Sequence, residues 1–415
     1  MPWVTEHHPT SEELNACVQC GLCLPVCPTF RLTGRETASP RGRLHAMSAV
    51  ANGTVELDET FAGIIDFCLG CRACEPVCPG MVPYGRALEG TRAEIDAQLP
   101  GRSRRNRWAL GTALGSRGLM RLAGVGMSLA QTLRLTGLAP RRYSRITGGL
   151  RRLGGRPAPT MGHVGGPGDA GTVGLLAGCI QDEWFRPVNH AAITLLERAG
   201  YRVAVPERQT CCGALAAHDG KAEAAERYMR QNADAFGGFD FVVATAAGCS
   251  AHLADYRWMG HRPETLDVTV AVARAIENGL LPRLEVDNGA IAIQDPCHLR
   301  HAQRVVAEPR AILAAAGFEV IETDELGLCC GAAGMYTVSQ PEASEKLGEQ
   351  KAGQVRATGS MRVASANPGC EMQLRSHLGD GFEIKHPIEW YLHALQEAER
   401  ELDGRVDDRG QPHSE

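Results

Sequence analysis

All sixteen cysteines of the chain fall into one of two spacing patterns, and both patterns suit metal–thiolate chemistry. The tighter pattern, C-x2-C-x2-C-x3-C-P, occurs twice and is closed by Pro28 and Pro79. It is the ferredoxin spacing that holds [4Fe–4S] clusters. Its cysteines are Cys17, Cys20, Cys23 and Cys27 in the first run and Cys68, Cys71, Cys74 and Cys78 in the second. The pattern therefore predicts two [4Fe–4S] clusters and a role in moving electrons.

The two tight runs are predicted to exchange one ligand each. In two-cluster ferredoxins the last cysteine of each run serves the cluster of the other run. The predicted sets are Cys17, Cys20, Cys23 and Cys78 for one cluster, and Cys68, Cys71, Cys74 and Cys27 for the other. Gly21 and Gly70 leave room for the backbone to approach the clusters. Zinc ribbons also use C-x2-C pairs, but two runs of four at this spacing favour iron and sulfide.

The remaining eight cysteines form a longer pattern, which also occurs twice. The candidate cofactor ligands are Cys179, Cys211, Cys212 and Cys249 in the first copy and Cys297, Cys329, Cys330 and Cys370 in the second. Four soft ligands suit an iron–sulfur cluster or zinc. Because adjacent thiols fit one cubane poorly, an unusual cluster or a redox-active pair is predicted, with a vicinal disulfide or buried structural thiols as alternatives. A fifth thiol is missing, since His252 and Gln373 stand where a C-x-x-C ending would place it.

Four histidines are weaker candidates for proton transfer or for hydrogen bonding to a cluster or quinone. His298 and His301 follow Cys297, His218 follows the first Cys-Cys-Gly, and His386 lies near the C-terminus. The alternative for each is an ordinary structural histidine.

The tight runs lie in residues 1–97, which we expect to form a helical two-cluster ferredoxin module. Ser39 and Pro40 start a predicted helix that stops at Gly53, and a second helix runs from Asp58 into Cys68. Residues 98–168 differ in composition, because the stretch from 100 to 168 contains thirteen arginines and no acidic residue. This segment is either a solvated linker with one or two helices, or an amphipathic basic helix that lies on an anionic membrane or docks a partner.

The longer pattern lies in two repeats, residues 169–286 and 287–400, followed by a polar tail over 401–415 that we expect to be frayed. The repeats are offset by 118 residues at the first three cysteines and by 121 at the last. Apolar strands are predicted at 173–177, 201–205 and 241–245, and again at 290–293, 318–321 and 361–364. Strands that alternate with helices predict parallel α/β units with the cysteines at strand ends. The expected fold class is therefore an α+β multidomain protein.

Length and charge exclude several classes of protein. The chain has 415 residues and a net charge of −5, so no nucleic-acid partner is predicted. No signal peptide or transmembrane helix is expected, which points to a reducing compartment where cysteine clusters bind metal. No G-x-G-x-x-G stands between a strand and a helix, so no flavin or nicotinamide site and no catalytic residue is predicted in this chain.

The whole pattern resembles the iron–sulfur subunit of bacterial glycolate oxidase (glycolate dehydrogenase). The resemblance covers nearly the full length, and it rests on the paired ferredoxin runs and four further stretches. These are CCGALAAHDG from Cys211, DPCHLRHAQ from Asp295, CCGAAGMYTVSQPEAS from Cys329 and NPGCEMQL from Asn367. It implies a cytoplasmic subunit held peripherally at the inner face of the cell membrane. A separate FAD subunit would oxidise glycolate to glyoxylate, and this chain would pass the electrons through its clusters towards quinone.

Single Cys-Cys-Gly units occur more widely, so other functions stay open. The first alternative is the iron–sulfur subunit of a D-lactate or glycerol-3-phosphate dehydrogenase. The second is a catalytic subunit like that of heterodisulfide reductase, which would reduce a disulfide or quinone at a Cys-Cys-Gly site. The third is a non-redox module in which metal only holds the fold.

Overall fold

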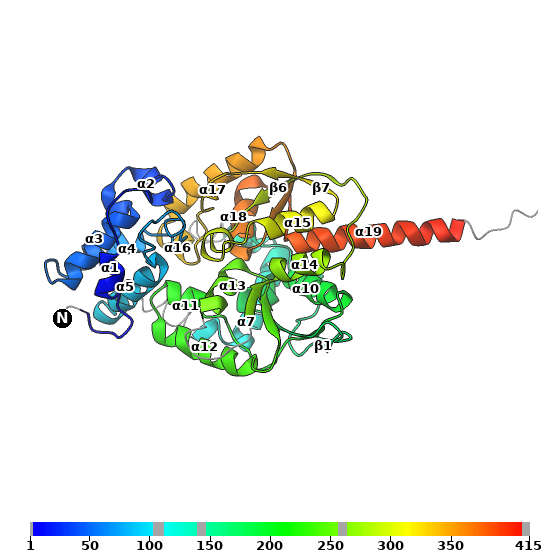
Figure 1. Cartoon of the computed structure of the whole chain (residues 1–415), viewed down its shortest axis with the longest axis horizontal. Coiled ribbons are helices and arrows are strands. Elements are labelled where there is room, and N and C mark those ends of the chain that lie inside the picture. The colour runs from blue at the N-terminus through cyan, green and yellow to red at the C-terminus, as the bar shows by residue number, and fades with distance from the viewer. Residues whose placement is uncertain (1–2, 103–111, 139–146, 256–263, 409–415) are drawn as a thin grey trace, which may run out of the picture.

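The computed structural model describes residues 3–102, 112–138, 147–255 and 264–408, with the backbone alone over 137–138 and 403–408. The N-terminal helices gather at one end of the molecule, and the two repeats form the larger remaining part (Figure 1). The last helix, α19 (Pro387–Asp408), points away from the N-terminal end. It continues through residues 401–408, where a frayed tail was expected.

The N-terminal module is helical, as predicted. Its elements are α1 (Ser11–Asn15), α2 (Pro28–Thr33), η1 (Glu36–Ala38), α3 (Pro40–Ala51), α4 (Glu59–Asp66) and α5 (Tyr84–Gln98). The side chain of Ser39 accepts a hydrogen bond from the Gly42 amide and starts α3, and Asp58 caps α4 in the same way through Phe61. Met47 and Ile65 from these two helices are fully buried. The helices therefore bring the two cysteine runs together around one small core.

The arginine-rich segment is more than a linker. It forms α7 (Arg117–Thr132), the 3-10 turn η3 (Leu135–Leu138) and the short strand β1 (Val164–Gly165). Strand β1 pairs antiparallel with the sheet of the first repeat. Residues 103–111 and 139–146 of this segment lie outside the described residues.

The first repeat is a five-stranded sheet in the order β1-β3-β2-β4-β5, parallel except for β1. Its elements after β1 are β2 (Thr172–Leu176), α9 (Cys179–Trp184), α10 (Arg186–Arg198), β3 (Arg202–Ala204), α11 (Ala214–His218), α12 (Ala222–Ala235), β4 (Phe241–Ala244), α13 (Ala247–Ala254), β5 (Glu264–Asp267) and α14 (Val268–Glu277). The predicted strands and their parallel pairing are confirmed.

The second repeat has the same strand order, β7-β6-β8-β9, and all its strands are parallel. Its elements before α19 are β6 (Gly289–Gln294), the π-helix η5 (His298–Ala302), α15 (Ala307–Ala315), β7 (Phe318–Glu322), α16 (Tyr336–Ser339), α17 (Pro341–Ala357), β8 (Arg362–Ser365), α18 (Pro368–Leu378) and β9 (Glu383–Lys385). Each repeat adds an edge strand that was not predicted, β5 and β9. Both are short and partly polar, so they lack a run of buried apolar residues.

The two repeats share one hydrophobic core. Leu195 of α10, Val272 of α14, Ile312 of α15 and Tyr391 of α19 belong to the same buried cluster, which also includes strand residues of both sheets. This common core fixes the two sheets, and with them the two sets of thiols, relative to each other.

Candidate metal centres

The first tight run surrounds a cavity at the surface of the N-terminal module. Cys17, Cys20, Cys23 and Cys78 all line it, together with Cys74, and the unfilled space including its open side is about 420 Å³. Cys20 is exposed. The structure thus brings Cys78 of the second run to the first three thiols of the first run. This is the grouping that ligand exchange requires, and the ligand set itself stays a prediction.

The second tight run is buried. Cys68, Cys71 and Cys74 are each at most 8 % exposed, and Cys27 lies close enough to influence the pKa of both Cys71 and Cys74. Burial raises the pKa of the Cys71 and Cys74 thiols well above the ordinary value.

Cys68 behaves differently from its neighbours because it lies near two guanidinium groups. Burial alone would raise its pKa, but the positive charges of Arg43 and Arg92 and hydrogen bonds from the Gly70 amide and Tyr84 hydroxyl lower it overall. Thiols beside the buried Arg43 and the half-buried Arg92 suit a group that carries negative charge through its sulfurs.

The two tight loops have the same backbone course. Gly21 and Gly70 have φ of 83° and 64°, in the left-handed region that glycine adopts easily. Gln19 and Arg72, which precede Cys20 and follow Cys71 respectively, both have φ of 59°. The sequence did not reveal these left-handed positions, because neither residue type favours that conformation.

In the first repeat, all four thiols lie at the ends of parallel strands. The Cys179 and Cys211 sulfurs are 3.4 Å apart, and those of Cys212 and Cys249 are 3.1 Å apart. Gly213 has φ of 89°, and its counterpart Gly331 in the second repeat has φ of 86°. Only glycine adopts this geometry easily, so it explains why glycine follows each cysteine pair.

In the second repeat, the thiols gather in the same way. Cys297 lies within hydrogen-bonding reach of Cys329, and Cys330 within reach of Cys370. The contact with Cys329 and the hydrogen bond to His298 hold the pKa of Cys297 well below its usual value. Asn367 donates to the Cys370 sulfur and accepts from the Gly248 amide of the first repeat, so it ties the two sites together.

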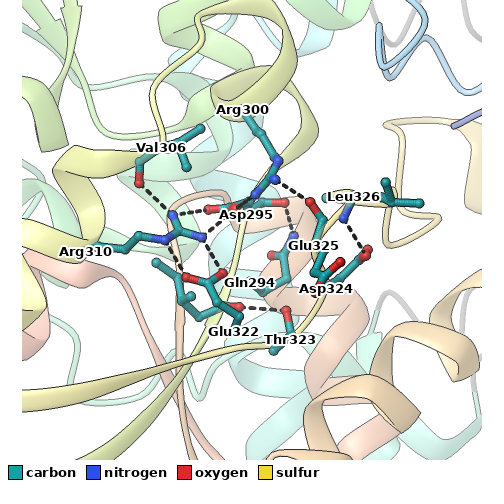
Figure 2. A network of polar contacts seen from close by, with 12 residues as sticks. Gln294, Asp295, Arg300, Val306, Arg310, Glu322, Thr323, Asp324, Glu325 and Leu326 are labelled. Atoms are coloured by element: carbon teal, nitrogen blue, oxygen red, sulfur yellow. Dashed lines mark hydrogen bonds and ion pairs between the residues drawn. The ribbon is translucent and has the colours of Figure 1, made fainter. Parts of the chain in front are cut away.

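A network of charged residues fixes the loops of the second site (Figure 2). The buried carboxylate of Asp295 accepts from Arg300 at 2.6 Å and from both terminal guanidinium nitrogens of Arg310 at 2.9 and 3.0 Å. Arg310 also binds Glu322 at the end of β7. Since Asp295 lies two residues before Cys297, the network sets the position of this thiol against the loop that leads to Cys329.

In the first repeat, different residues fix the loops that carry the thiols. Ala177 stands at the position equivalent to Asp295. Here the side-chain amide of Gln209 bridges the end of β2, because it donates to the Leu175 carbonyl and accepts from the Ala177 amide. Gln209 lies two residues before Cys211, and Ala177 lies two residues before Cys179. The bridge therefore fixes the positions of the two cysteine loops relative to each other.

The N-terminal module contacts both repeats through its second run. Cys71 packs in one apolar cluster with Cys329 and Tyr336, and the Tyr336 hydroxyl donates to the Phe67 carbonyl. Arg92 donates to the carbonyls of Cys68 and His218, 2.6 and 2.7 Å away. The buried run is therefore joined to the loops that carry the Cys-Cys-Gly pairs. Arg92 was not a predicted site residue, because its role depends on contacts between distant segments.

Three histidines meet at this junction. The rings of His218 and His298 have centroids 5.0 Å apart, and those of His218 and His252 are 6.2 Å apart. Glu89 binds His218 at 2.6 Å, and although burial opposes ionisation, this contact lowers the pKa of Glu89 to about 2. The structure thus places His218 and His298 between the two repeats, whereas His301 bonds to the Gly327 carbonyl.

His386 lies beside Glu389 and Arg151. Its Nδ1 accepts from the Ile388 amide, so the ring is neutral there. Burial lowers its pKa to about 3, and Arg151 adds to this effect. The geometry assigns His386 a structural role.

Burial of neutral His386 predicts a loss of stability in acid. The unfolded chain binds a proton below about pH 6.5 while the folded chain does not, so stability is complete above that pH and falls as the pH drops towards 3. At pH 5 the loss is about 2 kcal/mol. Thermal unfolding between pH 7 and 5 should show a smaller decrease for His386→Gln than for the wild type. His393→Gln, at an exposed histidine of α19, is the control and should keep the full decrease.

Comparison with known proteins assigns both patterns to families. Residues 13–82 match the family described as 4Fe-4S dicluster domain, and residues 173–254 and 291–375 each match the cysteine-rich domain. The chain is 33 % identical over 399 residues to the probable glycolate oxidase iron-sulfur subunit of Bacillus subtilis, covering 88 % of each chain. It belongs to the glycolate oxidase iron–sulfur subunit family. Iron–sulfur clusters are therefore its cofactors, with two [4Fe–4S] clusters in the N-terminal domain.

Two other relatives show how broad the similarity is. The glycolate oxidase iron-sulfur subunit of Escherichia coli is 28 % identical over 402 residues, 92 % of this chain and 94 % of that one. A fumarate reductase (CoM/CoB) subunit of Methanothermobacter marburgensis is 25 % identical over 386 residues, 90 % of this chain and 70 % of that one. The predicted family and the α+β architecture of a ferredoxin module with two cysteine-rich repeats are confirmed.

Neither a membrane span nor a simple mononuclear metal site stands out in the described residues. Among them, no helix combines the length and apolarity needed to cross a bilayer. In the same part of the chain, no three His, Cys, Asp or Glu side chains are arranged around a single metal ion.

Proposed function

We propose that this chain is the electron-transfer subunit of a membrane-associated, FAD-dependent glycolate dehydrogenase. A separate flavin subunit removes two electrons and two protons from glycolate to give glyoxylate, and the electrons leave through this chain to a quinone. Membership of the glycolate oxidase family supports this substrate, and D-lactate is the nearest alternative because selectivity would lie on the flavin subunit. The chain itself would sit at the inner face of the cell membrane.

The proposed ligands follow the thiol groupings. One [4Fe–4S] cluster would be held by Cys17, Cys20, Cys23 and Cys78, and the other by Cys68, Cys71, Cys74 and Cys27. Further clusters would be held by the four cysteines of each repeat. Bound clusters supply one-electron transfer, and the chain positions their thiolates, excludes water from the buried sets and balances their charge with Arg43 and Arg92.

The observation that carries the proposal is a continuous series of thiol sets from the surface to the interior. Cys20 is exposed, the Cys68–Cys74 run behind it is buried, and Cys71 packs against Cys329 of the second repeat. Asn367 then links the second site to the first. Such a series supports electron passage from a docked donor into the repeats.

The flavin subunit is proposed to dock around Cys20. Three apolar side chains are exposed near this end, Val18, Leu22 and Met81, and Met81 is 84 % exposed. Val18 and Leu22 also line the cavity that Cys20 shares. An apolar rim around the exposed thiol supports docking of a partner that must bring its flavin close to the cluster.

The first test is iron and acid-labile sulfide per chain on anaerobically purified protein, with an EPR spectrum of the reduced state. The two clusters of the N-terminal domain account for about eight iron atoms per chain. Additional clusters in the repeats would raise the measured iron content clearly above this value. About eight irons would leave the repeats outside the electron path. Absence of iron, or clusters that do not change on reduction, would overturn the proposed function.

Disulfide reduction is a second candidate, because each repeat places the two thiols of its Cys-Cys-Gly unit within reach of two further thiols. Cys179 and Cys211 also line a surface cavity, which would admit a small substrate. Turnover of a disulfide by the isolated chain, supplied only with an electron donor, would support this candidate. The lack of a fifth cysteine in both repeats counts against it.

A further inference from the structure

Helix α7 exposes an apolar face to solvent. Leu122, Val125 and Leu129 are 69, 62 and 57 % exposed, and Leu119 and Leu133 extend the same surface. The opposite side of the helix, with buried Met120 and Gly124, packs against the first repeat. The helix has 16 residues and is roughly 24 Å long. A monomer rarely exposes so continuous an apolar strip without a binding role.

The charge around this face matches an anionic lipid surface. Arg134, two residues after the helix, is exposed, and α7 itself contains no acidic residue. Arg121 lies on α7 and is exposed, and within the described part of the chain its guanidinium has no ion pair. An apolar face with basic neighbours is typical of helices that lie in the membrane interface.

The same helix forms a wall of a second cavity, which reaches the thiols of the first repeat. Arg117, Met120 and Arg121 of α7 line this cavity together with Cys179 and Cys211. Its unfilled space, including the open side, is about 430 Å³. Two acidic residues of α9 add polar groups to the lining, Asp182 and Glu183. The cavity therefore joins a candidate membrane surface to the candidate redox centre of the first repeat.

We propose that α7 lies on the anionic inner surface of the membrane and that the cavity behind it binds the head group of a lipid-soluble quinone. This inference rests on the proposed function and assigns the site at which electrons leave this chain for the quinone. A quinone bound there would take up two electrons, one at a time, from the iron–sulfur cluster that Cys179, Cys211, Cys212 and Cys249 would hold. The flavin subunit would re-reduce this cluster through the other clusters after each transfer. The quinone takes two protons from water at the open side of the cavity and leaves as quinol.

The membrane contact is tested with the full chain and the double variant Leu122→Glu/Leu129→Glu, which changes only exposed positions. Co-sedimentation with phosphatidylcholine vesicles containing phosphatidylglycerol should weaken by about a hundredfold, since each buried leucine contributes about tenfold. Leu402→Glu is the matched control, because Leu402 is a similarly exposed leucine on α19. Equal vesicle binding by the double variant and the control would overturn the membrane contact.

The quinone site is tested on protein reduced with dithionite and freed of excess reductant. The double variant should lose reoxidation by long-chain ubiquinone in vesicles and keep reoxidation by a soluble short-chain ubiquinone. Met120→Trp, which fills the cavity, should slow both reactions while iron content and EPR spectrum stay unchanged. Unchanged reoxidation by the soluble quinone in Met120→Trp protein with intact clusters would exclude this cavity as the exit.

These outcomes separate the inference from the function on which it rests. If the wild type holds clusters that reduce soluble quinone but does not bind anionic vesicles, the surface assignment is wrong and the function stands. If the double variant instead loses co-purification with the flavin subunit, α7 contacts the partner protein and the bilayer is excluded as its occupant. Protein without reducible clusters would overturn the proposed function itself.

Discussion

Replacing Cys71 by serine is expected to remove about four irons per chain and to reduce glycolate-dependent quinone reduction to background. A serine hydroxyl does not replace the thiolate that iron requires, and Cys71 stands between the surface run and the second repeat. The flavin subunit should still reduce an artificial acceptor, because its own chemistry needs no cluster. Iron content, EPR of the reduced state and activity with both acceptors measure this result.

Burial of Cys71 makes a second variant necessary, since loss of this cluster could also unfold the domain. Cys20→Ser changes an exposed thiol and should give the same loss of quinone reduction with a folded chain. Val55→Ser introduces the same hydroxyl at an exposed position outside the proposed docking surface and should keep all clusters. Quinone reduction that survives in the cysteine variants would disprove the proposed electron path.

Replacing Arg151 by methionine is expected to destabilise the protein by about 3–5 kcal/mol. The Arg151 guanidinium binds Glu371 at 2.6 and 2.7 Å and Glu389 at 2.7 Å, and these three side chains are 13, 3 and 10 % exposed. Methionine would leave two buried carboxylates without this counter-charge. Thermal and denaturant unfolding of the loaded chain should show the loss directly.

Two controls make the Arg151 prediction specific. Arg152→Met removes the neighbouring arginine, which has no ion pair with any described residue, and should change stability little. Glu371 keeps its ion pair with Arg375 in the single variant, so Glu389 is the carboxylate left without a cation. The double variant Arg151→Met/Glu389→Gln removes this charge and should recover much of the lost stability. If the single variant were as stable as Arg152→Met, the buried ion pairs would not hold the arginine-rich segment to the second repeat.

The thiol chemistry of this protein could be predicted from sequence because cysteine spacing is a local property. The central strands, α3 and α4 could be predicted for the same reason, because their capping residues and the spacing of their apolar residues are local features of the sequence. The edge strands β5 and β9 were missed because three or four partly polar residues resemble a loop. The structural role of Arg151 was not predicted, because its partners follow more than two hundred residues later.

The composition of the arginine-rich segment set it apart from the rest of the chain, but it did not show which arginines are exposed and which form ion pairs. The same thirteen arginines include Arg151, which is buried in an ion pair, and Arg121, which is exposed on α7. Only the packing of α7 on the first repeat shows which face of the helix is left open. Likewise, the meeting of His218 and His298 depends on how the two repeats are joined, which no local pattern encodes.

The shared core of the two repeats determines how electrons can travel between them. Small polar interfaces let domains swing, but a large apolar interface holds them at fixed separation. With Leu195, Ile312 and Tyr391 packed in one cluster, the thiol sets of the repeats have no hinge between them. In the proposed electron path, transfer between the repeats would therefore need no conformational gating, and its rate would be set by tunnelling across a constant distance.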